Sequence, residues 1–202
     1  MYGAAKLIVS LFRNPDVTRA VNKMLAKRDG LMFGVCNGFQ ALAKLGMFRN
    51  GQINDVDETY PTLGTNTIAR HISEYLHVKV GSTNSPWLAR VKTGELYQVP
   101  VSHGEGKFLA SDAEIARLVQ NGQVFSQYAD PNGKATMLRP YNPNGSKMAI
   151  EGLISPDGRV LGKMGHVERV PEHGQFVIGK NIYGNKFMPI IPAGVDYVER
   201  SR

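Results

Sequence analysis

The single cysteine of the chain stands in a pattern that suits a nucleophile. Gly34 and Gly38 lie two residues before and after Cys36, the spacing of a nucleophile on a sharp strand-to-helix turn. Such a turn is strained, so we expect both glycines to prevent clashes with the strand and the helix. The turn would also direct the sulfur toward the N-terminus of the next helix, where the helix dipole favours a thiolate. The alternative is an inert cysteine in the core.

A cysteine nucleophile needs a base, and His166 is the histidine best placed for that role. It follows an expected strand, and Glu168 comes two residues later. Side chains two residues apart on extended chain project to the same side, so we expect Glu168 to orient the imidazole through a hydrogen bond. We interpret His71 and His77 as surface residues, and His173 lies in a late turn. The alternative for His166 and Glu168 is a solvated pair at a hairpin end.

Strands and helices are predicted to alternate around these residues. Residues 31–35 form a short apolar run, typical of a strand buried on both faces, and apolar residues recur at helical spacing over 39–45. Residues 149–154 and 159–164 flank a Pro-Asp-Gly turn, which predicts a hairpin ending just before His166. This order favours an α/β fold with a mainly parallel sheet, whose sites form at the carboxyl ends of strands. The backbone N–H of Asn37 is then a candidate oxyanion donor.

Other segments carry clear local signals. Asn14 followed by Pro15 predicts a helix start, and Ser111 with Glu114 forms a capping box ahead of another helix. We expect β-structure within residues 65–80 and strands over residues 96–101 and 123–128. The tail from residue 174 has no clear pattern.

Composition limits the class of protein. With 202 residues and 42% apolar content, residues 1–202 are expected to form one domain with its own core. One cysteine excludes an internal disulfide, and no long apolar run predicts a membrane span, so we expect a cytoplasmic protein. The net charge of +7 is spread along the chain without interleaved aromatic residues, which argues against a nucleic-acid partner.

Four motifs together resemble class I glutamine amidotransferases. They are Gly-Val-Cys-Asn-Gly-Phe-Gln at 34–40, Ser-His-Gly-Glu-Gly-Lys-Phe at 102–108, Asn-Pro-Asn-Gly-Ser at 142–146, and Ser-Pro-Asp-Gly-Arg-Val-Leu-Gly-Lys-Met-Gly-His-Val-Glu-Arg at 155–169. More narrowly, they resemble the glutaminase domain of phosphoribosylformylglycinamidine synthases. The resemblance implies a three-layer αβα, flavodoxin-like fold.

The resemblance also implies an activity and a site. Glutamine would be hydrolysed through a thioester on Cys36, with His166 as base and Glu168 as its support. Gln40, Asn37, His103, Gly104 and Glu105 are the candidates for binding the glutamine substrate, while residues 142–146 are interpreted as a turn without direct chemistry.

Partners and cofactors also follow from the resemblance alone. Ammonia would pass to a synthetase region, in cis or in trans, that uses ATP and magnesium to aminate formylglycinamide ribonucleotide. No metal or cofactor is expected in the glutaminase domain itself.

The chain departs from the family pattern in two places. The prolines that often flank the histidine in this family are absent around His166, which leaves the rigidity of that turn unexplained. No strand and glycine-rich oxyanion segment precede the helix that begins near Asn14, so we expect a domain truncated at its N-terminus. Loss of one oxyanion donor typically costs about 10²–10³-fold in rate. We also expect an open sheet edge there and self-association through it.

Two other functions are compatible with the residues. The first is an interaction or remnant domain that keeps the fold and the cysteine without catalysis. The second is a cysteine hydrolase of related fold acting on peptides or small aldehydes, although Gln40 and the Ser-Pro-Asp-Gly motif argue against it.

Overall fold

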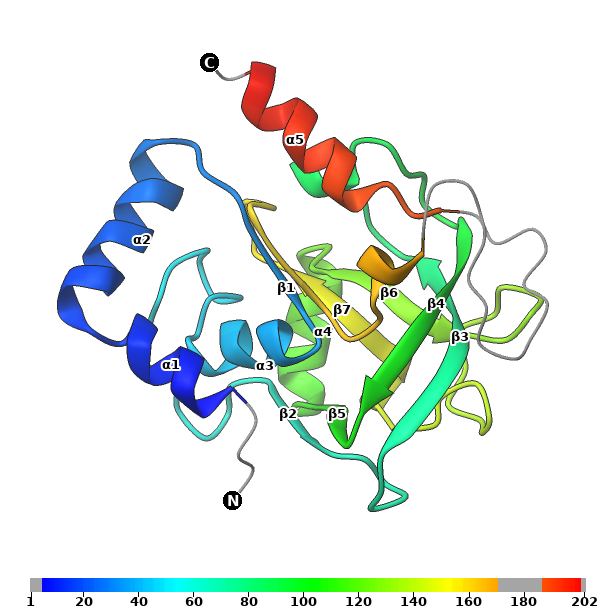
Figure 1. The fold of residues 1–202 in the computed structure, drawn as a ribbon. Helices are drawn as coiled ribbons and strands as arrows, with labels where there is room; N and C mark the ends of the chain where they lie inside the picture. The colour runs from blue at the N-terminus through cyan, green and yellow to red at the C-terminus, as the bar shows by residue number, and fades with distance from the viewer. Residues whose placement is uncertain (1–4, 171–186, 201–202) are drawn as a thin grey trace.

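The computed structural model describes residues 5–170 and 187–200. A six-stranded sheet in the order β1-β8-β7-β6-β3-β4 forms the centre, and β2 pairs with β5 in a small second sheet (Figure 1). The strands are β1 (Met32–Val35), β2 (Thr62–Thr65), β3 (Ile72–Val80), β4 (Leu96–His103), β5 (Glu105–Leu109), β6 (Val124–Ala129), β7 (Ile150–Ile154) and β8 (Val160–Lys163). The helices are α1 (Lys6–Phe12), α2 (Pro15–Lys27), α3 (Asn37–Lys44), α4 (Asp112–Gln120) and α5 (Ile190–Arg200), with short 3₁₀ turns η1 (Pro86–Leu88), η2 (Lys147–Ala149) and η3 (Val167–Arg169).

The prediction of a mainly parallel sheet is wrong. Among the described strands, β1 and β8 pair in parallel, whereas β8–β7, β7–β6, β6–β3 and β3–β4 are antiparallel. Parallel neighbours need a long crossover, but residues 155–159 join β7 to β8 directly as a hairpin. The apolar run in β1 could not reveal this, because the direction of pairing is set by the connections between strands.

Helices cover both faces of the sheet, in agreement with the expected three layers. One core contains Leu25 of α2, Phe39 and Leu42 of α3, and Leu118 of α4. The other core contains Leu161 of β8 and Ile190 of α5, together with residues of β3, β4 and η1. In Figure 1, α3 and α5 accordingly lie on opposite sides of the sheet. The α/β fold class predicted from the sequence is therefore confirmed.

Several local predictions are confirmed by the structure. The Asn14 side chain accepts hydrogen bonds from the backbone N–H groups of Asp16 and Val17 and caps α2, and Ser111 accepts one from Glu114 N and caps α4. The expected hairpin is formed by β7 and β8. Helices α1 and α5 were not predicted. His173 lies outside the described residues.

Strand β1 is less buried than its apolar sequence suggested. Among the described strands it comes first in the sheet order and pairs only with β8. Within it, Gly34 is buried while the other three residues are partly exposed. Phe33 packs against Trp87, with ring centroids 5.3 Å apart. The prediction of a strand buried on both faces is therefore wrong, because β1 lies at an edge of the sheet.

Candidate active site

Cys36 occupies a strained turn between β1 and α3. Its backbone has φ 51° and ψ −105°, a region that residues with a side chain rarely adopt, and it is the N-cap residue of α3. A Cβ added to Gly34 would lie 2.7 Å from the backbone carbon of Gly38, so Gly34 is required for the close approach of strand and helix. A Cβ at Gly38 would meet no atom within 4 Å. The expectation that both glycines relieve clashes is therefore right for Gly34 and wrong for Gly38.

The parallel pairing of β1 with β8 brings His166 to the cysteine. Val35 lies opposite Lys163 in the register, and Cys36 N donates to Lys163 O at 2.8 Å. Strand β8 ends at Lys163, so the chain carrying His166 leaves the sheet beside the strained turn. His166 N donates to Pro100 O of β4 at 2.8 Å and fixes the other side of that segment.

His166 and Glu168 interact as predicted, although their backbone is not extended. His166 Nδ1 lies 2.5 Å from Glu168 Oε1. Residues 167–169 form η3, with His166 as its N-cap residue, so a tight 3₁₀ turn rather than a strand end brings the two side chains together. With Nδ1 facing the carboxylate, the other ring nitrogen, Nε2, is left for the cysteine.

The electrostatics link His166 to the thiol. A hydrogen bond with Cys36 and then one with Glu168 raise the pKa of His166 to about 9, against a smaller opposing effect of burial. In the described part of the chain, the buried Nε2 atom has no partner with the geometry of a full hydrogen bond. The Cys36 thiol is thus near enough to raise the pKa of His166 without meeting the geometry of a full hydrogen bond. Burial is the largest single effect on Glu168 and raises its pKa, but the hydrogen bond from His166, a backbone hydrogen bond and the charges of His166 and Arg169 together outweigh it, so the net shift is downward.

The remaining predicted substrate residues gather beside the cysteine. Cys36 Sγ lies 3.7 Å from Ser102 O, and the buried Gln40 side chain donates through Nε2 to Glu105 O. Gln40 therefore ties α3 to the segment that contains Gly104. Asn37 is exposed at the first position of α3, where its N–H has no acceptor within the helix.

His103 is buried and held by Asn66. Asn66 Nδ2 donates to His103 O at 2.8 Å and to Arg70 O at 3.0 Å, so Asn66 Oδ1 faces His103 Nδ1 at 3.2 Å as an acceptor. This arrangement puts the proton on Nδ1 and leaves Nε2 as a buried acceptor without a partner among the described residues. Burial lowers the pKa of His103 to about 4, and His103 is therefore neutral at pH 7. Glu105 Oε2 is a second buried acceptor of this kind.

Comparison with known proteins identifies the family. A family model described as "CobB/CobQ-like glutamine amidotransferase domain" matches residues 1–198. The phosphoribosylformylglycinamidine synthase subunit PurQ of Gloeobacter violaceus is 34% identical over 171 residues, 85% of this chain and 68% of that protein. The subunit of the same name from Koribacter versatilis is 34% identical over 157 residues, 78% of this chain and 62% of that protein.

This chain belongs to the CobB/CobQ-like glutamine amidotransferase domain family. The solved structure of PurLQS from Thermotoga maritima supports the fold of the amidotransferase domain, with a TM-score of 0.64 at 22% identity over 94% of this chain and 71% of that chain. The sequence resemblance to glutamine amidotransferases is thereby confirmed.

Residues 142–146 are a structural support of the amidotransferase domain. The buried Asn144 donates to Gly106 O at 3.0 Å, and Ser146 Oγ accepts from Phe108 N at 3.0 Å. Both bonds hold β5, which begins at Glu105. Residues 142–146 therefore hold β5, the strand that follows the segment beside Cys36, in place. The sequence of the motif gave no sign of that role.

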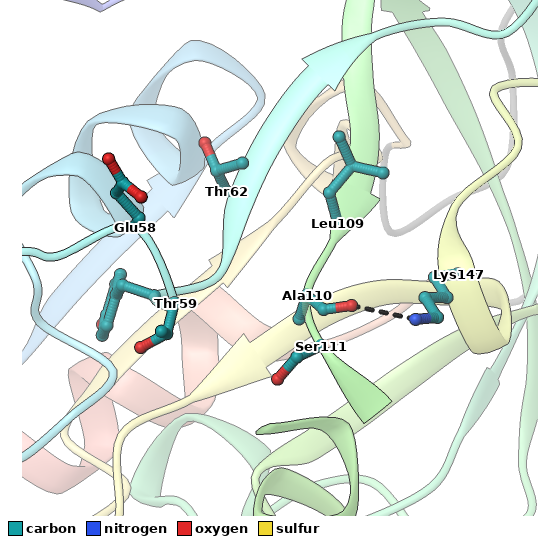
Figure 2. Close-up of a pocket in the computed structure, with 8 residues that line it drawn as sticks. Glu58, Thr59, Thr62, Leu109, Ala110, Ser111 and Lys147 are labelled. Atoms are coloured by element: carbon teal, nitrogen blue, oxygen red, sulfur yellow. Dashed lines mark hydrogen bonds between the residues drawn. The ribbon is translucent and has the colours of Figure 1, made fainter. Parts of the chain in front are cut away.

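A hollow of about 430 Å³ lies apart from this cluster. Figure 2 shows it between residues 58–62 and residues 109–111, with Lys147 at one end. Lys147 Nζ donates to Ala110 O at 3.0 Å and pairs with Asp112 at 2.8 Å. None of the predicted site residues lines this hollow, and the ammonium group of Lys147 is already paired with Asp112.

Residues 5–170 and 187–200 contain neither a metal-binding cluster nor a membrane-spanning helix. No group of three His, Cys, Asp or Glu side chains there is arranged to hold a metal ion. None of the helices in these ranges has the length and apolar character needed to span a bilayer.

Replacing Glu168 by glutamine should lower the pKa of His166 and slow turnover. The raised pKa of about 9 depends partly on the Glu168 carboxylate, so the titration midpoint should move down toward 6.5. We expect a loss in kcat of about 10–100-fold, smaller than the loss of about 10³-fold or more for His166→Ala, because proton transfer matters more than orientation. Imidazole NMR between pH 5 and 10 gives the midpoint, and glutamate release gives the rates.

The same shift sets the sign of the pH dependence of stability. A pKa above the unfolded value of about 6.5 means that the stabilising contribution of protonated His166 is complete below pH 6.5 and lost as the pH rises through about 9. The stability difference between wild type and Glu168→Gln should therefore shrink over that interval.

Equal losses of kcat in Glu168→Gln and His166→Ala would show that Glu168 has another role.

Proposed function

We propose that this domain hydrolyses glutamine at Cys36 and supplies ammonia for amination of formylglycinamide ribonucleotide in purine biosynthesis. The observation that carries the proposal is the position of Cys36 on a strained turn beside His166. On the other side of the imidazole, His166 Nδ1 lies 2.5 Å from Glu168 Oε1. The relatives named PurQ support the choice of pathway. The matched regions span 68% and 62% of these two relatives, and the activity of the whole protein is part of this proposal.

The proposed reaction has two steps. In the first, Cys36 Sγ attacks the side-chain amide carbon of glutamine while His166 carries the thiol proton, and the C–N bond breaks as His166 protonates the leaving nitrogen. Ammonia leaves, and a thioester remains on Cys36. In the second, His166 takes a proton from water, which attacks the thioester carbon, and glutamate and the free thiol are regenerated.

Substrate recognition is assigned to the segment that Gln40 ties to α3. The neutral His103 and the Glu105 carboxylate present the buried acceptors described above, and the glutamine α-ammonium and amide groups are donors that match them. Gly104 lies between these two residues, and its carbonyl accepts from Asn66 N at 3.0 Å. The N–H of Asn37 is our candidate for one oxyanion donor.

The partner in this proposal is a synthetase subunit or region, in cis or in trans. It uses ATP and magnesium for the amination, whereas hydrolysis at Cys36 uses protein side chains alone. The solved structure that supports the fold is that of PurLQS from Thermotoga maritima. We expect the assembly to act in the cytoplasm.

The test is glutamate release together with labelling by a glutamine-like diazo-ketone. The chain is mixed with a PurL-type synthetase, ATP, Mg²⁺ and formylglycinamide ribonucleotide, and glutamate and product are measured. We expect glutamate release that depends on Cys36, and diazo-ketone labelling of Cys36 detected by mass spectrometry. Cys36→Ser is the matched control, since it keeps the size of the side chain and removes the thiolate.

One outcome would favour a domain without catalysis. If a general thiol reagent labels Cys36 but the diazo-ketone does not, and no glutamate appears with the synthetase present, the glutamine pocket is not assembled and the proposal is wrong. Release of product from a peptide or an aldehyde in place of glutamine would instead indicate a cysteine hydrolase.

A further inference from the structure

A fully buried ion pair lies at the base of the turn that carries His166. Lys163 Nζ contacts Glu151 Oε1 at 3.0 Å, and both side chains are 0% exposed. The two residues stand on the neighbouring antiparallel strands β8 and β7. Desolvation offsets most of the attraction in such pairs, and apolar replacements are often neutral or stabilising. Fold stability alone is therefore a weak explanation for charges at these positions.

The pair binds both peptide groups of Gly165, the residue directly before His166. Gly165 N donates to Glu151 Oε1 at 2.6 Å, and Lys163 Nζ donates to Gly165 O at 3.0 Å. Ser126 Oγ donates to the other carboxylate oxygen and so fixes the orientation of Glu151. The charged side chains therefore hold the backbone on both sides of Gly165.

Gly165 is packed so closely that any side chain there would force its neighbours to shift. A Cβ there would lie 2.5 Å from Val99 Cγ2, 2.9 Å from Lys163 Nζ and 3.0 Å from Glu151 Oε1. The next residue, His166, is anchored through its own N–H to Pro100 O. The path of the chain from β8 to the imidazole is thus fixed without a proline on either side of His166.

We propose that the Glu151–Lys163 pair is a positioning device that holds the Gly165 peptide so that the imidazole of His166 meets Cys36. Its catalytic consequence rests on the function proposed above. The pair acts through Gly165, and we assign it no contact with the substrate. A displacement of about 1 Å at a reacting group can cost about 10²-fold in rate. Loss of the pair should therefore reduce chemistry far more than substrate binding.

The test compares two double variants. Glu151→Leu with Lys163→Met keeps similar volumes and removes every side-chain hydrogen bond of the pair to Gly165. It should lower kcat for glutamine hydrolysis by about 10–100-fold, with KM changed by less than about 3-fold. Glu151→Gln with Lys163→Gln removes the charges but keeps an acceptor for Gly165 N and a donor for Gly165 O. This second variant should retain most of the wild-type kcat.

Gln123→Met is the matched structural control. Gln123 is fully buried, and its amide donates to Phe48 O at 2.8 Å and Ile154 O at 2.9 Å without contacting Gly165. It should lower stability and leave kcat unchanged. If Glu151→Leu with Lys163→Met also lowers only stability, the positioning role is overturned. If that double variant does not fold, Ser126→Ala decides: we expect a kcat several-fold lower, and an unchanged kcat rejects the proposal.

Alkylation of Cys36 by iodoacetamide separates this proposal from the proposed function, because it needs no glutamine. The alkylation rate at pH 7 in Glu151→Leu with Lys163→Met should fall to that of His166→Ala, since a displaced imidazole no longer contacts the thiol. If wild type releases no glutamate but the alkylation rates of wild type and the variants differ as expected, the positioning role stands and the glutaminase proposal fails. Alkylation at the wild-type rate in the folded variant overturns the positioning role.

Discussion

Cys36→Ala should abolish glutamate release, with a loss of about 10⁴-fold or more in kcat. Removal of the nucleophile stops thioester formation. The remaining groups of the site then give only the small residual rate that is typical of enzymes whose nucleophile has been removed. The measurement is glutamate formation in the presence of the synthetase, with Cys36→Ser in parallel. A Cys36→Ala protein with more than about 1% of the wild-type rate would place the chemistry elsewhere.

Cys36→Gly is the control that separates the thiol from the backbone. Alanine keeps the strained φ of 51° at this position, whereas glycine adopts it without steric cost. Both variants should be inactive, but Cys36→Gly should be more stable than Cys36→Ala by about 1 kcal/mol in urea unfolding. Equal stabilities would mean that the turn is not strained.

Gly34→Ala should destabilise the domain by about 1–3 kcal/mol, the usual cost of overpacking. The added Cβ would lie 2.6 Å from Leu42 Cδ1 and 2.7 Å from the backbone carbon of Gly38. The leucine side chain can move, but the backbone of α3 can do so only by pulling the helix and Cys36 away from β1. Urea unfolding followed by circular dichroism gives the change in free energy, and the rate of Cys36 alkylation reports any displacement of the thiol.

Gly38→Ala is the matched control for Gly34→Ala. No atom lies within 4 Å of a Cβ at position 38, and alanine is favoured over glycine within a helix by up to about 1 kcal/mol. We expect Gly38→Ala to be as stable as wild type or slightly more stable. If both substitutions destabilise the protein equally, steric crowding at Gly34 does not explain why the strand-to-helix turn needs glycine.

Much of the candidate site was visible in the sequence because its signals are local. The turn at Cys36, the cap at Asn14, the hairpin that ends before His166 and the pairing of His166 with Glu168 all depend on residues close together in the chain. Interactions of this kind are set by backbone preferences and side-chain reach over a few residues. The family motifs added the substrate candidates Gln40 and His103, which no local pattern singled out.

What the tertiary structure decided is how distant segments pair. The mainly antiparallel sheet, the edge position of β1, and the register that sets Val35 opposite Lys163 arise from connections and packing across more than 100 residues. Burial of Glu151 beside Lys163 was equally invisible, since a charged residue within an apolar strand is ordinarily expected to face solvent. The sequence by itself therefore determined which groups are able to react, and the tertiary structure decided which of them meet, because contact between remote segments depends on the sheet order and register of the whole fold.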